Sequence, residues 1–148
     1  MKRSIVAFMA TCLALGLMLT NVSVQAESKA FADKKVVLQI SDPNPFKQTL
    51  VLNVANNLIK HYGQDRVEVE IVAFGPGLRL LFAENSNKGR VDSLVGSGVR
   101  FSACKNTIKN MAKKLGHEPE LSKHSVKVDA GVVRIVDLVK KGYILVKP

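Results

Sequence analysis

The sequence predicts an α/β domain whose parallel strands form a sheet that helices cover on both faces. Strand-like runs alternate with helical patterns of about ten residues or more through residues 34–148, which is typical of βαβ units. Right-handed crossovers between parallel strands then place helices on both sides of the sheet. The 148-residue chain shows no internal repeat, so one domain with a substantial core is expected.

The strands are predicted where β-branched and aromatic residues form short runs. In the second run the first half alternates with Glu68 and Glu70, whereas the end is continuously apolar and predicts burial. The fourth run is weak, because only two valines alternate there. The five predicted strands are Val36–Ile40, Val67–Phe74, Val99–Ser102, Val126–Val128 and Tyr143–Val146.

Between the strands, apolar residues recur at the spacing of one helix face. Asn44 can cap the first helix, with Pro45 at its first position, and Gly63 fits its end. The predicted helical segments are Pro45–His61, Leu78–Phe82 followed by Arg90–Val95, Thr107–Leu115 and Val132–Val139.

Four connections are expected at one edge of the sheet. In an open parallel sheet, ligands bind outside the carboxyl ends of the strands. Cys104 lies in the third of these connections, so we expect it to face polar and glycine-rich loops instead of the core. The connections are Ser41–Asn44, Gly75–Gly77, Ala103–Asn106 and Asp129–Gly131.

The N-terminus has the pattern of a cleavable secretory signal peptide. Two basic residues precede the mostly apolar run Ile5–Leu19, and small residues predict cleavage after Ala26. A retained membrane anchor is the alternative, which the run disfavours because spanning helices need roughly 18–20 residues. We therefore expect a periplasmic or secreted protein with no membrane contact after cleavage. The predicted division is a signal peptide over 1–26, a linker over 27–33 and a single domain over 34–148.

The chain is strongly basic. Its formal net charge is +10, and loss of the two basic residues of the signal peptide leaves +8. Nucleic acid is not an expected partner, because the sequence has no aromatic-rich basic motif. The remaining interpretations are a solvated basic surface or attraction to an acidic protein partner or small anions. Lys105, Lys109 and Lys113 form one basic stripe along the third helix.

Cys104 is the only cysteine expected after signal cleavage, since Cys12 lies in the signal peptide. One unpaired cysteine is unusual in an oxidising compartment. It lies where a strand ends and a helix begins, so backbone N–H groups and the helix dipole favour its thiolate. Arg100, Lys105 and Lys109 add positive charge nearby in the sequence. We expect an ionised and reachable sulfur; the alternative is a buried, inert thiol.

Other catalytic and metal-binding patterns are incomplete. Gly75–Gly77 lacks the remainder of a dinucleotide or phosphate-loop motif, so a tight turn is the simpler interpretation. Ser102 and Lys105 match a Ser-x-x-Lys pattern whose two partner motifs are missing from the sequence. The three histidines have no fixed spacing to Cys104 that favours a hydrolase or a zinc site. No metal and no cofactor are therefore expected.

Several segments together carry a resemblance to a known family. They are Lys35–Asp42, Val72–Leu78, Gly98–Thr107, Gly131–Ile135 and Lys141–Tyr143. The chain resembles the DsrE/DsrF-like family of sulfur-relay proteins, and most closely a branch of small, mostly uncharacterised members, some of them exported. The resemblance implies a three-layer α/β/α domain with a five-stranded, mainly parallel sheet, often assembled into homo-oligomers.

The resemblance also implies a function for the cysteine. In better-known members, a cysteine after the third strand accepts sulfur as a persulfide and passes it on, and Cys104 occupies this position. The chain departs from those members in its export signal, and Lys105 and Asn106 stand in place of an arginine-rich segment. A sulfur carrier or relay is thus expected. The alternatives are a non-catalytic module for small-anion binding or assembly, and a redox protein resolved through an intermolecular disulfide.

The expected pocket has two sides. Ser102, Lys105 and Asn106 should surround the sulfur and stabilise its negative charge. The opposite wall should be formed by Asp42, Gly75, Pro76 and Gly77, and Ser41 and Asn44 also belong to the expected pocket.

Overall fold

The computed structural model describes Lys29 and residues 31–148, and the predicted signal peptide with its cleavage site lies outside the described residues. The described chain forms a five-stranded sheet in the order β4-β3-β2-β1-β5, and every pairing between its strands is parallel. This confirms the predicted α/β class. The strands are β1 (Lys34–Ile40), β2 (Val67–Ala73), β3 (Arg100–Cys104), β4 (Ser125–Val128) and β5 (Ile144–Val146).

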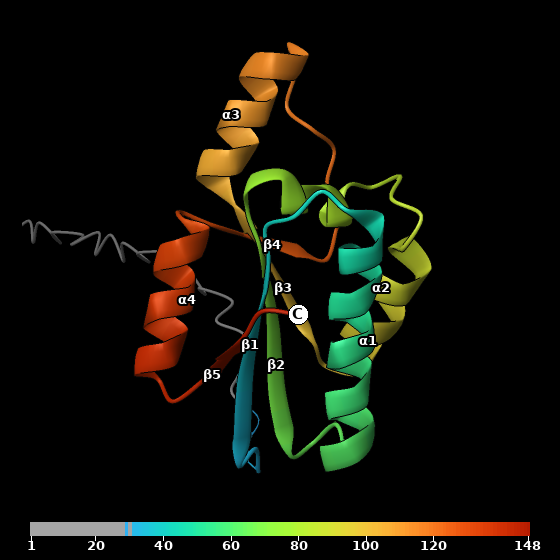
Figure 1. Ribbon diagram of the computed structural model, residues 1–148, viewed down its shortest axis with the longest axis vertical. Helices are drawn as coiled ribbons and strands as arrows, with labels where there is room; N and C mark the ends of the chain where they lie inside the picture. Colours follow the sequence, from blue (N-terminus) through green and yellow to red (C-terminus); the bar gives the residue numbers. More distant parts are fainter. Residues whose placement is uncertain (1–28, 30) are drawn as a thin grey trace, which may run out of the picture.

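Helices lie on both faces of the sheet and produce three layers (Figure 1). α1 (Pro45–Tyr62) and α2 (Lys88–Gly96) cover one face, and α4 (Gly131–Lys140) covers the other. The connections through α1 and α2 advance from β1 toward β3, whereas the connection through α4 returns from β4 to β5. Right-handed crossovers in opposite directions place their helices on opposite faces, so the predicted α/β/α layering is confirmed.

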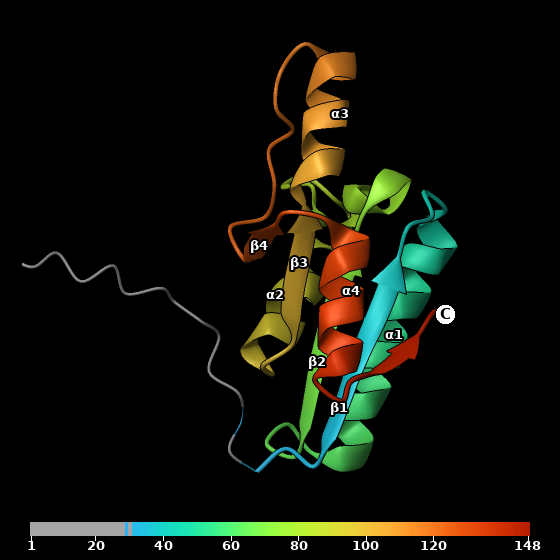
Figure 2. The ribbon, with the colours of Figure 1, turned by 90° about the vertical axis from the view of Figure 1, so that its left-hand side faces the viewer.

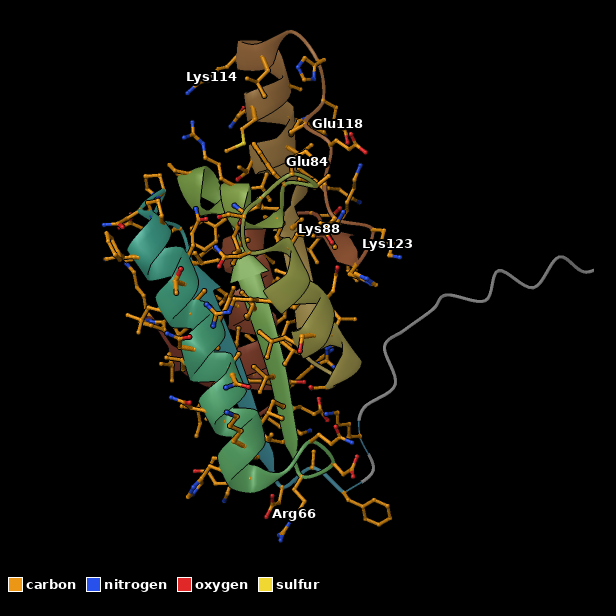
Figure 3. The ribbon with its side chains drawn as sticks, turned by 90° about the vertical axis from the view of Figure 1, so that its right-hand side faces the viewer. Arg66, Glu84, Lys88, Lys114, Glu118 and Lys123 are labelled. Atoms are coloured by element: carbon orange, nitrogen blue, oxygen red, sulfur yellow. The ribbon has the colours of Figure 1, made fainter. Side chains whose placement is uncertain are left out.

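α3 (Lys105–Leu115) extends beyond the carboxyl ends of the strands and covers neither face of the sheet (Figure 2). Ile108 is its one buried residue. Figure 3 shows Lys114 near the far end of this helix and Arg66 at the opposite end of the molecule. Of the helices in the described part of the chain, none combines the length and the apolar character needed to cross a membrane.

η1 (Gly75–Leu81) is a 3-10 helix that begins at the Gly-Pro-Gly turn, directly before the apolar residues that predict it. The junction at Cys104 differs from the sequence prediction. β3 includes Cys104, and α3 begins at Lys105 where Thr107 was the predicted start. The first turn of α3 is polar, so the apolar pattern alone places the start of this helix too late.

The apolar core is uneven between the two faces of the sheet. The large cluster lies against α1, α2 and η1 and includes buried side chains such as Leu38, Leu52 and Ile71. The α4 face holds a much smaller cluster, built around Val72 and Leu138. Buried polar side chains occupy the rest of that face.

Glu68 and Glu70 are the unexpected members of the α4 face. They are 2% and 0% exposed, and all seven residues of β2 are buried. The sequence predicts burial only for the apolar end of this strand. The two carboxylates tolerate burial because arginines from other elements pair with them, which no local pattern reveals.

Candidate functional site at Cys104

Cys104 is the last residue of β3 and the N-cap residue of α3, so it lies at the predicted carboxyl edge of the sheet. Side chains alternate along β3, which places Ser102 and Cys104 on the α4 face and Phe101 and Ala103 in the main core. Cys104 is only 5% exposed. The expectation of a reachable sulfur is therefore wrong for this conformation, because the start of α4 lies against the thiol.

Backbone N–H groups at the N-termini of two helices lie near Cys104. The N–H groups of Asn106 and Thr107 belong to the first turn of α3, and the N–H of Gly131 is the first of α4. Cys104 is itself the N-cap residue of α3 and makes no capping hydrogen bond in this structure, and the N-cap residue of α4 makes none either, so the first N–H groups of both helices lack a capping side-chain acceptor. Burial raises the pKa of the Cys104 thiol, but donors from the Thr107 hydroxyl and these three N–H groups outweigh it and lower that pKa. The site favours the thiolate.

Thr107 supplies the side-chain donor to the sulfur. Its Oγ1 accepts a hydrogen bond from the Gly75 N–H at 2.9 Å, which leaves its own hydroxyl hydrogen to point at Cys104. Gly75 has a φ of 52°, in the left-handed region that favours glycine. Thr107 is not among the predicted site residues. Its place in the first helical turn after Cys104 is the signal that could have found it.

Gly131 brings α4 into close contact with the end of β2. A Cβ at this position would lie 2.8 Å from the Cβ of Phe74, a separation that real side chains do not adopt. Glycine therefore permits the first turn of α4 to approach the sheet closely enough for its N–H to face the sulfur.

Lys105 and Asn106 lie beside the thiol, but their roles differ from those expected. The Lys105 Nζ is 2.8 Å from Asp129 Oδ1, so a carboxylate in the connection before α4 pairs with its charge. Asn106 contributes its backbone N–H. The positive potential at the sulfur thus comes from peptide dipoles more than from the lysine.

Ser41, Asp42 and Asn44 form a separate group at the end of β1. Asp42 Oδ1 accepts the Asn44 N–H at 2.9 Å, and Asn44 in turn caps α1 as predicted. Ser41 and Asp42 border a cavity of about 150 Å³ together with Lys47 and other residues. The three residues do lie at the predicted edge. Asp42 was expected opposite Cys104, but β2 lies between β1 and β3, and the cavity that Asp42 lines does not include Cys104.

Of the Gly75–Gly77 turn, only Gly75 joins the thiol site. Gly77 packs on the end of β1, where a Cβ would lie 2.5 Å from the carbonyl oxygen of Ile40. Pro76 lines a cavity of about 200 Å³ between η1 and α3. Of the three residues of this turn that were expected to line the thiol pocket, Pro76 and Gly77 therefore lie elsewhere.

Ser102 does not stabilise charge on the sulfur, contrary to expectation. Its buried hydroxyl donates a hydrogen bond of 2.7 Å to Glu70 Oε1 on the neighbouring strand. The Glu70 carboxylate is a stronger acceptor than the Cys104 sulfur, so the Ser102 hydroxyl donates to Glu70 and not to the thiol.

A buried charge network fills the α4 face beside the thiol. Arg134 of α4 contacts Glu70 through Nε and Nη2, at 2.7 and 2.8 Å. Arg100 lies 3.2 Å from Glu70 and 3.3 Å from Glu68. The Tyr143 hydroxyl bonds with both Glu68 and Arg100. The network thus ties β2, β3, α4 and the segment before β5 together.

The network keeps its members in defined protonation states. Burial raises the pKa of Glu70, but hydrogen bonds from Arg134 and Ser102 outweigh it and lower that pKa. Burial and the hydrogen bond to Glu68 raise the pKa of Tyr143 to about 12. Glu70 is therefore charged and Tyr143 neutral at physiological pH. The sequence predicts no role for these residues, and the one signal is a pair of glutamates in an otherwise apolar strand.

The site can hold an anionic sulfur and has no arrangement for a metal ion. Within Lys29 and residues 31–148, no group of three or more His, Cys, Asp and Glu side chains is placed to hold one.

Comparison with known proteins supports the fold. A similar solved structure is the protein of unknown function MTH1491 from Methanobacterium thermoautotrophicum, with a TM-score of 0.71. The match has 29% sequence identity and covers 78% of this chain and 100% of that chain. No protein-family model and no curated protein matches the sequence.

Proposed function

We propose that the protein is a DsrE/DsrF-like sulfur carrier or relay that acts in the periplasm, with Cys104 as the sulfur-accepting group. The observation that carries the proposal is the place of Cys104 between the N-termini of two helices: it is the N-cap residue of α3, and it pairs in register with Val128, shortly before α4 begins at Gly131. The thiolate, not the thiol, is the nucleophilic form of cysteine. Within residues 31–148, Cys104 is the only cysteine, so no internal disulfide competes for it.

The proposed step transfers one sulfur atom to Cys104. With thiosulfate as donor, the Cys104 thiolate attacks the outer sulfur, and a new S–S bond forms to the cysteine. The S–S bond of thiosulfate breaks, and its electron pair leaves on sulfite. The product is a persulfide anion on Cys104, so the total charge is unchanged and no separate oxidant is required. The same N–H groups can hold the persulfide anion.

The charge and burial of the site favour a small anionic donor. Lys109 and Lys113 are exposed on α3, the helix that begins beside Cys104. A basic surface raises the local concentration of anions such as thiosulfate or polysulfide. Because Cys104 is 5% exposed, a small donor needs less opening of the site than a bulky one.

An assembly module on the same fold is the second candidate function. Exposed apolar residues on α4 and β5 favour it, because such surfaces are typical of protein interfaces. These residues are Val132, Val133, Val136, Val139, Ile144, Leu145 and Val146. In this alternative Cys104 is a packing residue, and Cys104→Ser keeps the assembly and the cellular function.

Mass spectrometry after exposure to thiosulfate or polysulfide tests the main proposal. We expect one added sulfur atom on the peptide that contains Cys104, removed by a thiol reductant and missing in Cys104→Ser. A known persulfide acceptor treated in parallel is the positive control. If the control is labelled and Cys104 is not, sulfur handling is excluded under these conditions and the assembly function becomes the better conclusion.

A further inference from the structure

The ion pair between Glu70 and Arg134 joins the first turn of α4 to the centre of the sheet. Both nitrogen–oxygen distances, 2.7 and 2.8 Å, belong to one side-on contact of the guanidinium with the carboxylate. Such a two-point contact defines orientation as well as distance. Glu70 is 0% exposed, and Ser102 and Arg100 hold its carboxylate from β3, so the anchor on the sheet side is rigid.

The anchored turn is the one that faces the thiol. The Arg134 backbone N–H donates to the Ala130 carbonyl at 2.9 Å and closes the first turn of the helix. Gly131 lies inside this turn, which begins directly after the segment beside Cys104: Cys104 pairs in register with Val128, and the next residue, Asp129, is 2.8 Å from Lys105. A donor contact of the Gly131 N–H helps to lower the pKa of the thiol. Apolar packing of α4 on the sheet comes from Ile135 and Leu138, further along the helix. The ion pair is thus a buried polar contact that restrains the start of α4, in addition to the exposed pair of Lys105 with Asp129 in the connection before the helix.

We propose that Glu70 and Arg134 are positioning residues that hold the first turn of α4, and with it the Gly131 N–H, against the Cys104 sulfur. The inference deepens the proposed function, because it assigns the buried network to the same thiol. It does not require that sulfur transfer occurs, only that the thiolate depends on the placement of α4.

Direct electrostatics and positioning make opposite predictions for Glu70→Gln. Removal of a nearby negative charge alone would favour the thiolate and lower the thiol pKa. Loss of the contact with Arg134 would move the Gly131 N–H away from the sulfur and would raise the thiol pKa. Lys105 and Asp129, the other charged groups beside the site, stay paired and unchanged in this variant.

The experiment is a pH titration of thiolate absorbance, with the matching Cys104→Ser protein subtracted for each variant. For Glu70→Gln we expect a midpoint about one pH unit higher than in the parent protein, the size of one lost hydrogen bond to a charged group. A midpoint that is unchanged or lower overturns the proposal. Circular dichroism confirms that each variant is folded.

Arg134→Lys provides the second arm and stands alone if Glu70→Gln does not fold. Lysine keeps the positive charge but cannot make the two-point contact, so positioning predicts a higher midpoint and charge alone predicts no change. Arg100→Lys is the matched control, because Arg100 contacts the same carboxylate at 3.2 Å from β3 instead of α4. Equal shifts in Arg100→Lys and Arg134→Lys, or none in Arg134→Lys, overturn the proposal. No sulfur donor is present, so failure here is distinct from failure of the labelling experiment.

Discussion

At the residue scale, Thr107 joins the thiol to the turn after β2. One hydroxyl serves two partners: it accepts the Gly75 N–H and donates to Cys104. The sulfur therefore depends on a side chain that also holds η1 in place. This double use makes Thr107 the residue whose loss should affect both the ionisation of the thiol and the stability of the fold.

We expect Thr107→Val to raise the thiol pKa and to lower the free energy of unfolding by about 1–3 kcal/mol, because the Gly75 N–H loses its acceptor. Alkylation rates across a pH series measure the first effect, and urea unfolding measures the second. Thr107→Ser is the control, since it keeps the hydroxyl and should stay close to the parent protein in both measurements. A thiol pKa in Thr107→Val that is unchanged from the parent protein would contradict the assigned role.

At the element scale, α4 presents apolar side chains on two sides. Ile135 and Leu138 pack on the sheet, while Val132, Val136 and Val139 point outward at helical spacing. Short helices rich in β-branched residues have little intrinsic stability and depend on packing. An outward valine stripe on such a helix indicates a further packing partner, and a second copy of the chain is the partner that the proposed assembly requires.

We expect the protein to form oligomers through this stripe, and Val136→Lys to shift it toward the monomer because a buried lysine lacks a partner charge. Light scattering coupled to size-exclusion chromatography measures the mass. Leu50→Lys, at an exposed apolar position on α1, is the control and should leave the mass unchanged. A monomeric parent protein would refute the stripe as a self-association surface.

At the scale of the whole molecule, the buried network makes stability depend on pH. Burial opposes the charged form of Glu70, but its hydrogen bonds hold its pKa below the ordinary value of 4.5. A carboxyl with a lowered folded-state pKa stabilises the protein above its unfolded pKa. That stabilisation is lost as the pH falls through the folded-state value.

We therefore expect the free energy of unfolding of the parent protein to fall as the pH drops below 4.5, the ordinary pKa of this carboxyl. In Glu70→Gln it should be about 3 kcal/mol lower at neutral pH, because the half-buried Arg100 and Arg134 lose the buried carboxylate that pairs with them, and it should change less with acidification. Urea unfolding at several pH values tests this. Asp33→Asn, which removes only an exposed pair with Arg66, should keep the parent pH dependence. The same pH slope in Glu70→Gln as in the parent would refute a stabilising role of the network.

Local features of the site were predictable, and pairings between distant segments were not. The junction at Cys104 follows from a β-branched run that ends where a helical pattern starts. The partnership of Glu70 and Arg134 spans 64 residues, and neither neighbourhood signals the other. Asp42 was expected opposite the thiol because the strand ends share an edge, but no single segment of the sequence reveals the order of the strands along that edge.

The sequence by itself determined the α/β class, the succession of strands and helices, and the place of Cys104 at a strand end, because periodicity and turn residues act over a few positions. Only the tertiary structure decided which groups meet at the sulfur, the burial of Glu68 and Glu70, and the use of Ser102 away from the thiol. Those outcomes depend on the strand order and on the return of α4 across the sheet, where side chains far apart in the chain come within hydrogen-bond distance.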